Sequence, residues 1–253
     1  MIIVVRKRFQ HVSHITKFCF DESIIDEMFG HIKYIHGCRC LTKRKLSIMF
    51  ILIIVLLFII NYNKLFCVKY EEETNKYSSL VYMSAEERNI IRLYLNKSHT
   101  MLEYGSGYST LYFSQFVNAY YSIEHNEQWY KTIKSLIDHS PIISSIIKKY
   151  ILIHINPGYK GWLGGYSEGN KIQFHGYIHA VHSLNVIKFD RVLIDGRARV
   201  DCAFEISSYL DKNSIIFVHD YSNRDHYFNI SKKYYKIILQ TYEGQTLAAF
   251  KLR

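Results

Sequence analysis

The stretch Met101–Thr110 constrains the fold of this chain most, because it joins a short apolar run to an acid and two glycines. Leu102 and Glu103 end the run, and Gly105 and Gly107 follow with one residue between them. Glycine lacks the Cβ atom that would keep a ligand away, and the amides that open the next helix point into the gap. The pattern predicts a strand-to-helix turn against a nucleoside, although an ordinary glycine turn has the same spacing.

The residue three places after Gly107 distinguishes between two nucleoside cofactors. A dinucleotide-binding turn has a third glycine or an alanine there, so that helix and strand pack closely, whereas this chain has Thr110. Glu-x-Gly-x-Gly without the third glycine fits S-adenosylmethionine better than NAD. We therefore expect S-adenosylmethionine as the cofactor, and a nicotinamide-dependent oxidoreductase is the less favoured hypothesis.

Three later apolar runs also end on an acid. The first ends at Glu124, 17 residues after Gly107, where a second parallel strand would bring a carboxylate to a ribose. The other two end at Asp195 and Asp220. The carboxyl ends of parallel strands meet at one edge of a sheet, where open α/β folds bind their ligands. Together with Glu103, the sequence predicts four carboxylates along that edge.

The chain resembles class I S-adenosylmethionine-dependent methyltransferases over about residues 80–253. The resemblance is carried by the stretches Leu102–Thr110, Ser122–His125, Val192–Arg199 and Val218–Tyr221. It implies an α/β, Rossmann-like methyltransferase fold with a mostly parallel seven-stranded sheet, helices on both faces and an antiparallel last strand. In that superfamily the glycine turn holds the methionine part of the cofactor, and the acid after the second strand holds the ribose. The implied cofactor-binding residues are Glu103, Gly105, Gly107, Ser109, Glu124 and Asp195.

The branch is similar, more distantly, to the metal-dependent catechol and macrolide O-methyltransferases. Acids after the fourth and fifth strands hold a divalent cation in those enzymes, and Asp195 and Asp220 occupy matching places. The catechol enzymes follow the second acid with Asn, whereas this chain has Tyr221. A divalent metal at these acids is therefore an alternative that the sequence does not favour.

Methyl transfer needs a nucleophile that is aligned with the sulfonium and relieved of its proton. Positioning supplies most of the rate, and a base adds about 10²–10⁴-fold. His219 and Asp220 close the fifth strand beside the expected methyl donor, so we expect one of them to act as base or orienter. The predicted catalytic residues are His219, Asp220 and Asp195, and a packed strand-end histidine is the alternative for His219.

Residues 46–62 form an apolar run without a charge, at the short end of the length that spans a bilayer. Basic residues are more numerous on its amino side, which ends in Lys43–Lys45, than on the other side, where Glu71–Glu73 dilute the lysines. Cytosolic flanks carry the excess of basic residues, so the amino terminus is expected in the cytosol. The predicted organisation is a cytosolic basic tail at 1–45, a transmembrane signal-anchor at 46–62, a stalk at 63–79 and a methyltransferase-like domain at 80–253.

This topology predicts a type II single-pass membrane protein of the Golgi or endoplasmic reticulum with a lumenal catalytic domain. The triplets that begin at Asn96 and Asn229 are glycosylation acceptor patterns on the proposed lumenal side. The net charge is +10, and half of the excess lies in residues 1–45. A basic segment beside a membrane meets anionic lipid more often than nucleic acid, so no nucleic-acid partner is expected.

The resemblance and the lumenal topology together imply O-methylation of a glycan or a small hydroxylated acceptor. A catalytically silent cofactor-fold domain, used for anchoring or partner binding, is the alternative. Such a domain has no need of Glu124 or Asp220, and the presence of both favours an enzyme.

Two segments leave their roles open. The loop at 156–166 is rich in glycine and aromatic residues, which fits either a substrate cover or a surface excursion. His175, His179 and His182 share one helical face, a pattern that a metal site or a plain polar face would have. The polar face is favoured, because no cysteine or carboxylate triad is near in the sequence.

Overall fold

The computed structural model describes residues 51–59, 76–153, 171–222, 225–242 and 245–253. The chain divides into two compact units, Met1–Glu73 and Thr74–Arg253. Residues 51–59 of the first unit are helical, and within the described ranges no helix is both long and apolar enough to cross a membrane. The predicted span at 46–62 extends beyond the described residues on both sides, so it stays a prediction, as do the domain boundaries. The tail at 1–45 and the loop at 156–166 lie outside the described residues.

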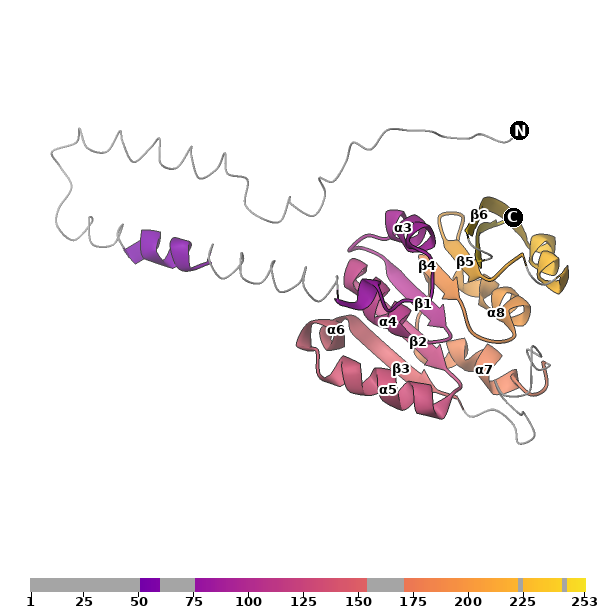
Figure 1. Ribbon diagram of the computed structural model, residues 1–253, viewed down its shortest axis with the longest axis horizontal. Helices are drawn as coiled ribbons and strands as arrows, with labels where there is room; N and C mark the ends of the chain where they lie inside the picture. Colours follow the sequence, from indigo (N-terminus) through magenta and orange to yellow (C-terminus); the bar gives the residue numbers. More distant parts are fainter. Residues whose placement is uncertain (1–50, 60–75, 154–170, 223–224, 243–244) are drawn as a thin grey trace. The chain divides into compact units, whose positions relative to one another are not determined.

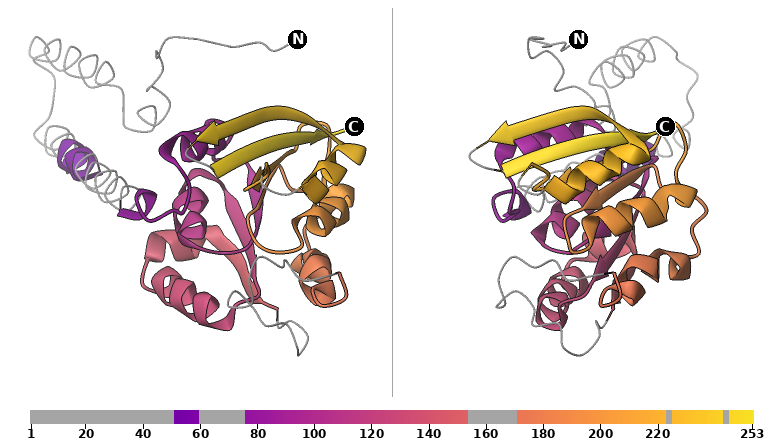
Figure 2. Two further views of the ribbon diagram at one scale, coloured as in Figure 1. Left: turned by 45° about the vertical axis from the view of Figure 1, so that its right-hand side comes forward. Right: turned by 90° about the vertical axis from the view of Figure 1, so that its right-hand side faces the viewer.

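The second unit is built on a seven-stranded sheet of order β3-β2-β1-β4-β5-β7-β6 (Figure 1). Strands β1 to β5 pair in parallel, whereas β7 is antiparallel to both of its neighbours, β5 and β6, beside which it lies in Figure 2. The structure therefore confirms the predicted α/β fold with its mostly parallel sheet and antiparallel last strand. The strands are β1 (Thr100–Tyr104), β2 (Ala119–Glu124), β3 (Ile147–Leu152), β4 (Arg191–Ile194), β5 (Ile215–His219), β6 (Tyr234–Tyr242) and β7 (Gln245–Leu252).

Helices cover both faces of this sheet, as the resemblance implied (Figure 1). Successive side chains of a strand point to opposite faces, so a strand buried on both faces is apolar throughout. In β1, Leu102 and Tyr104 pack into one core with α7 and α8, and Met101 packs into the other with α3 to α6. The α-helices are α3 (Ala85–Leu93), α4 (Tyr108–Phe113), α5 (Glu127–Asp138), α6 (Pro141–Ile146), α7 (His175–His179) and α8 (Arg199–Glu205).

Short 3₁₀ segments follow or connect these helices. They are η2 (Ser114–Phe116), η4 (Ala180–Leu184), η5 (Ile206–Tyr209) and η6 (Asp225–Lys232). α3 begins after a capping box of Ser84 and Glu87, in which the Ser84 amide donates to Glu87 Oε2 at 2.9 Å.

Candidate functional site

The turn after β1 contains Gly105, which has φ +89°. A Cβ atom at Gly105 would lie 2.4 Å from the backbone of Gly196, which follows β4, and a Cβ atom at Gly196 would lie 2.1 Å from Tyr177 Oη. Real Cβ atoms do not approach other atoms this closely. The two glycines therefore allow the turns after β1 and β4 to pack against each other, a reason for Gly105 that the sequence did not reveal.

Gly107 differs from Gly105 in both conformation and surroundings. Its φ is −174°, an extended conformation that any residue adopts. A Cβ atom at Gly107 would meet Trp129 Nε1 at 3.5 Å and Ser109 Oγ at 3.6 Å, which are ordinary contacts. Neither the backbone nor the packing of the described residues requires glycine at position 107.

Glu103 lies fully buried beneath the glycine turn and accepts hydrogen bonds from three hydroxyl groups. Ser109 donates to Oε1 at 2.5 Å, whereas Thr110 and Ser122 donate to Oε2, Ser122 at 3.0 Å. Burial raises the pKa of Glu103 to about 7, although these hydrogen bonds oppose the shift. Thr110 Oγ1 also accepts from the Gly107 amide at 3.0 Å. Glu103 and Thr110 therefore hold the shape of the turn, and the Ser109 hydroxyl points to Glu103.

Glu124, the last residue of β2, is buried beside the same turn. Its Oε2 accepts from the Ser106 amide at 2.7 Å, and its Oε1 accepts from the His125 and Asn126 amides at 2.8 and 2.7 Å. A carboxylate offers about four lone-pair sites, so these three bonds leave acceptor capacity. The structure thus brings Glu124 and the glycine turn together, as the spacing predicted.

The carboxyl ends of β4 and β5 carry a cluster of opposite charges. His219 Nδ1 lies 2.9 Å from Asp195 Oδ1 and 3.8 Å from Asp220 Oδ1. His219 Nε2 lies 3.6 Å from Oε2 of Glu87, the acid of the capping box at the start of α3. The three predicted catalytic residues therefore lie together, with Glu87 as a fourth member.

The ionisation of His219 follows from these neighbours. Burial alone would lower its pKa, but the charge of Asp195 and the hydrogen bond to it, together with the nearby carboxylates of Glu87 and Asp220, raise the pKa to about 10. The pKa of Asp195 is lowered, because the nearby His219 and Arg199 outweigh its burial. A protonated imidazole has no lone pair that accepts a proton, so the geometry favours His219 as an orienter over His219 as a base.

Arg199, at the start of α8, links the ends of β4 and β5. Its buried guanidinium donates to the carbonyl groups of Gly196, at 2.9 Å, and of His219. Its Nη2 lies 3.3 Å from Asp220 Oδ2 and 3.5 Å from Asp195 Oδ1. Sequence reasoning gave Arg199 no role, although its spacing of four residues from Asp195 was a usable signal.

Asp220 has a left-handed backbone, with φ +52°, and its side chain is 33% exposed. Residues other than glycine rarely adopt this conformation, although Asp tolerates it better than most. Tyr221 is buried in the core against Phe250, with ring centroids 5.3 Å apart. Asp220 is therefore the most exposed carboxylate of the cluster, and Tyr221 points into the core.

Asp195, His219 and Asp220 have ligand atoms close enough together to hold a metal ion. However, the guanidinium of Arg199 and the imidazolium of His219 already pair with both carboxylates. A cation that entered would meet two fixed positive charges, so these acids fit a metal poorly in this arrangement.

Trp129 of α5 was not expected from the sequence to lie at the site. Its indole N–H donates to the Ser106 carbonyl, and its ring makes an edge contact with Tyr108 at a centroid distance of 5.7 Å. The indole therefore covers the turn beside Gly107, and 37% of the residue stays exposed.

No family model matches the sequence, and neither does any curated protein. Among solved structures, a methyltransferase-like protein from Silicibacter pomeroyi DSS-3 has a TM-score of 0.54 and 21% identity, over 68% of this chain and 89% of that chain. An rRNA methylase from Streptococcus thermophilus has a TM-score of 0.45 and 9% identity, over 66% and 94% of the two chains. A Streptococcus mutans protein in complex with SAH has a TM-score of 0.45 and 8% identity, over 68% and 100%. The Silicibacter pomeroyi structure shows that this chain has a Rossmann-like methyltransferase fold.

Proposed function

We propose that this chain is an S-adenosylmethionine-dependent methyltransferase. The observation that carries the proposal is Gly107, which lies between Glu103 and Glu124 in the chain and for which the described residues give no steric reason. A glycine that the protein does not need sterically is explained by a ligand whose atoms lie against the backbone. Open α/β sheets bind ligands at this edge, outside the carboxyl ends of the strands.

In this proposal the two carboxylates near the turn have different roles. Glu124 uses its remaining acceptor capacity to bind the ribose hydroxyls, and the Ser106 amide holds its carboxylate in place. Glu103 keeps the turn in shape from below and reaches the cofactor only through Ser109 and Thr110. The glycine turn itself then lies along the methionine part of the cofactor.

The charged cluster would serve the acceptor. S-adenosylmethionine would supply the methyl group and leave as S-adenosylhomocysteine, and the hydroxyl proton of the acceptor would pass to a base in this cluster. Asp220 is our candidate base, because its carboxylate is the most exposed in the cluster. His219 and Arg199 orient Asp195 and Asp220 as fixed cations.

We also propose a glycan or small hydroxylated acceptor, and a lumenal domain anchored through residues 46–62. Asn96 is exposed and is the better glycosylation candidate, since Asn229 Nδ2 already donates to the His226 carbonyl at 2.9 Å. Glycosidase treatment of protein made in eukaryotic cells should increase its gel mobility, and Asn96→Gln should remove most of that change. Protection of the amino-terminal tail from protease in sealed vesicles, with the domain digested, would reverse the orientation.

One observation favours the alternative of a catalytically silent domain. Trp129 covers the turn, and Glu124 already accepts three backbone hydrogen bonds. A silent domain would keep this closed arrangement and bind no nucleoside.

Calorimetry on the full-length chain distinguishes the two hypotheses. We expect binding of S-adenosylmethionine and S-adenosylhomocysteine, and none of NAD. Glu124→Ala should lower the affinity for S-adenosylhomocysteine by roughly ten- to hundredfold, because a lost charged hydrogen-bond acceptor costs about 1.5–3 kcal/mol of binding free energy. Glu127→Ala is the matched control, since Glu127 is an exposed acid three residues away that pairs with Lys131. Absence of binding by the unmodified chain would support the silent domain.

A further inference from the structure

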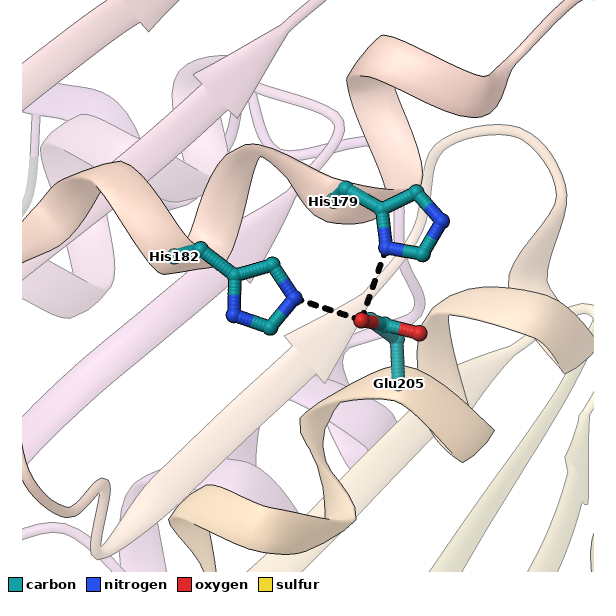
Figure 3. A group of neighbouring side chains, drawn as sticks. All are labelled: His179, His182 and Glu205. Atoms are coloured by element: carbon teal, nitrogen blue, oxygen red, sulfur yellow. Dashed lines mark hydrogen bonds and ion pairs between the residues drawn. The ribbon is translucent and has the colours of Figure 1, made fainter.

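Two histidines and a glutamate meet on the side of the molecule where α7 and η4 approach α8 (Figure 3). Both rings point toward the Glu205 carboxylate. His179 Nδ1 lies 2.7 Å from Glu205 Oε1, and His182 Nε2 lies 2.6 Å from the same oxygen. The sequence gave no carboxylate for these histidines, because Glu205 lies 23 residues beyond His182. The fold supplies the missing ligand.

The donor set has the composition of a zinc site. Zinc is bound by imidazole nitrogens at about 2.0–2.1 Å and carboxylate oxygens at about 2.0–2.2 Å, and two His with one Glu occur in sites that keep an open fourth position. Around a tetrahedral ion at these lengths, neighbouring ligand atoms are roughly 3.3 Å apart. The two nitrogens here are within 0.7 Å of that distance from Glu205 Oε1, and all three ligand atoms lie within 4.8 Å of one another. Small side-chain rotations would therefore admit the ion in place of the shared hydrogen-bonding protons.

The second nitrogen of His182 is also held in place. Its Nδ1 lies 2.7 Å from the Tyr209 hydroxyl, so Tyr209 can accept the Nδ1 proton and leave Nε2 free to bind metal. Histidine ligands of metals almost always have such a partner for the other nitrogen, which fixes the ring and its tautomer. Tyr209 therefore holds the His182 ring in the orientation and tautomer that metal binding requires.

The three side chains are also accessible to an ion from solvent. They are 30%, 52% and 22% exposed for His179, His182 and Glu205. His175 lies one turn before His179, with ring centroids 4.3 Å apart, and is one candidate for the open position. A water molecule is the other donor for that position.

We propose that His179, His182 and Glu205 bind one zinc ion, which joins the α7–η4 segment to α8. The site is independent of the cofactor and of the Asp195–His219–Asp220 cluster. Its consequence for the fold is local: α7 carries Tyr177, whose hydroxyl packs against Gly196, and α8 carries Arg199. The ion would therefore fix two elements that support the carboxyl edge of the sheet.

The test is calorimetric titration of the full-length chain with zinc chloride, after chelator treatment and with a purification tag that contains no histidine. We expect one ion per chain. Zinc at about a hundred times its dissociation constant should raise the melting temperature by about 5–10 °C, because it binds only the folded protein.

Variants connect the binding to two of the three ligands, His182 and Glu205. His182→Gln keeps about the size of the side chain and a hydrogen-bond donor for Glu205, and Glu205→Gln removes the charge and one of the two acceptor oxygens. Each should lower the affinity for zinc by at least about a hundredfold, since changes to residues that only hold a ligand in place already cost 10–100-fold. His139→Ala is the control, because His139 is an exposed histidine at the end of α5.

The outcomes separate a metal site from a hydrogen-bonded polar cluster. Zinc binding that both glutamine variants abolish and His139→Ala preserves would support the site. Absence of stoichiometric binding, or binding equally strong in the glutamine variants, would overturn it. Circular dichroism of the variants at low temperature shows whether they are folded, so lost binding is not mistaken for unfolding.

Discussion

The two halves of the sheet's carboxyl edge are built from different chemistry. At the ends of β1 and β2, which we call the glycine half, hydroxyl groups and backbone amides surround Glu103 and Glu124. At the ends of β4 and β5, the charged half, Asp195 and Asp220 pair with two buried cations, His219 and Arg199. Each half therefore holds two carboxylates, which neutral hydrogen-bond donors stabilise in the glycine half and cations stabilise in the charged half.

This difference indicates a division of work along the edge. Neutral hydrogen-bond donors and a glycine backbone fit a nucleoside cofactor. Its hydroxyl groups need hydrogen-bond partners, and its sulfur-containing chain needs a backbone that it can approach closely. Fixed opposite charges keep groups in position with little reorganisation, which suits the place where charge develops during group transfer. We therefore propose that the cofactor binds at the glycine half and the acceptor at the charged half.

The largest effect on stability is expected at Arg199. Arg199→Met keeps an apolar stem but removes the guanidinium that neutralises the buried end of β5, and breaking a buried pair typically costs about 3–5 kcal/mol. Chemical denaturation of the full-length chain measures this loss. Lys212→Met, at an exposed site, should change stability by less than about 0.5 kcal/mol. If Arg199→Met costs no more than the control, the charged half is not held together by its cations.

Gly105→Ala should have the next largest effect, in the glycine half. The variant places a Cβ atom against the backbone of Gly196 and in a left-handed conformation, so we expect a loss of about 2–4 kcal/mol. Denaturation curves compared with those of Gly176→Ala provide the measurement, because a Cβ atom at Gly176 has one ordinary contact, at 3.4 Å from Ile153. An unchanged midpoint for Gly105→Ala would show that the two turns do not need to pack so closely.

His219 should give the charged half a dependence on alkaline pH. Because the pKa of His219 is raised to about 10 from an ordinary 6.5, its stabilisation is complete below about pH 6.5 and is lost as the pH rises through about 10. The slope in this window is at most about 1.4 kcal/mol per pH unit. Denaturation midpoints between pH 6 and pH 10 should therefore fall less steeply in His219→Gln than in the unmodified chain. Parallel curves would mean that His219 is neutral in the folded protein.

The strands that support both halves follow from the sequence, because buried parallel strands are continuous apolar runs. β3 is the exception: it begins at Ile147, whereas its continuous apolar run begins only at Tyr150. Lys148 and Lys149 interrupt the apolar pattern, and lysines are common on edge strands, where β3 lies. α6 was also missed, although Ser140 caps it and Pro141 begins it, a recognised start signal.

The candidate site was predictable only where its residues lie next to a motif. Glu103 and Glu124 lie at strand ends and Gly107 lies shortly after one, so the spacing found them. Trp129 and Glu87 come from helix surfaces whose direction depends on how α5 and α3 pack on the sheet, so no local pattern reveals them. The same is true of Glu205, which approaches His182 only because α8 lies beside η4.

The most direct test of the division between the halves is the affinity of Gly107→Ala for S-adenosylhomocysteine. The added Cβ atom meets only ordinary contacts within the protein, so stability should change by less than about 1 kcal/mol. If the cofactor lies against Gly107, the same atom should weaken binding by at least tenfold, measured by calorimetry beside the unmodified chain. Equal affinity of the two proteins, or no binding of S-adenosylhomocysteine by the unmodified chain, would contradict the assignment of the cofactor to the glycine half.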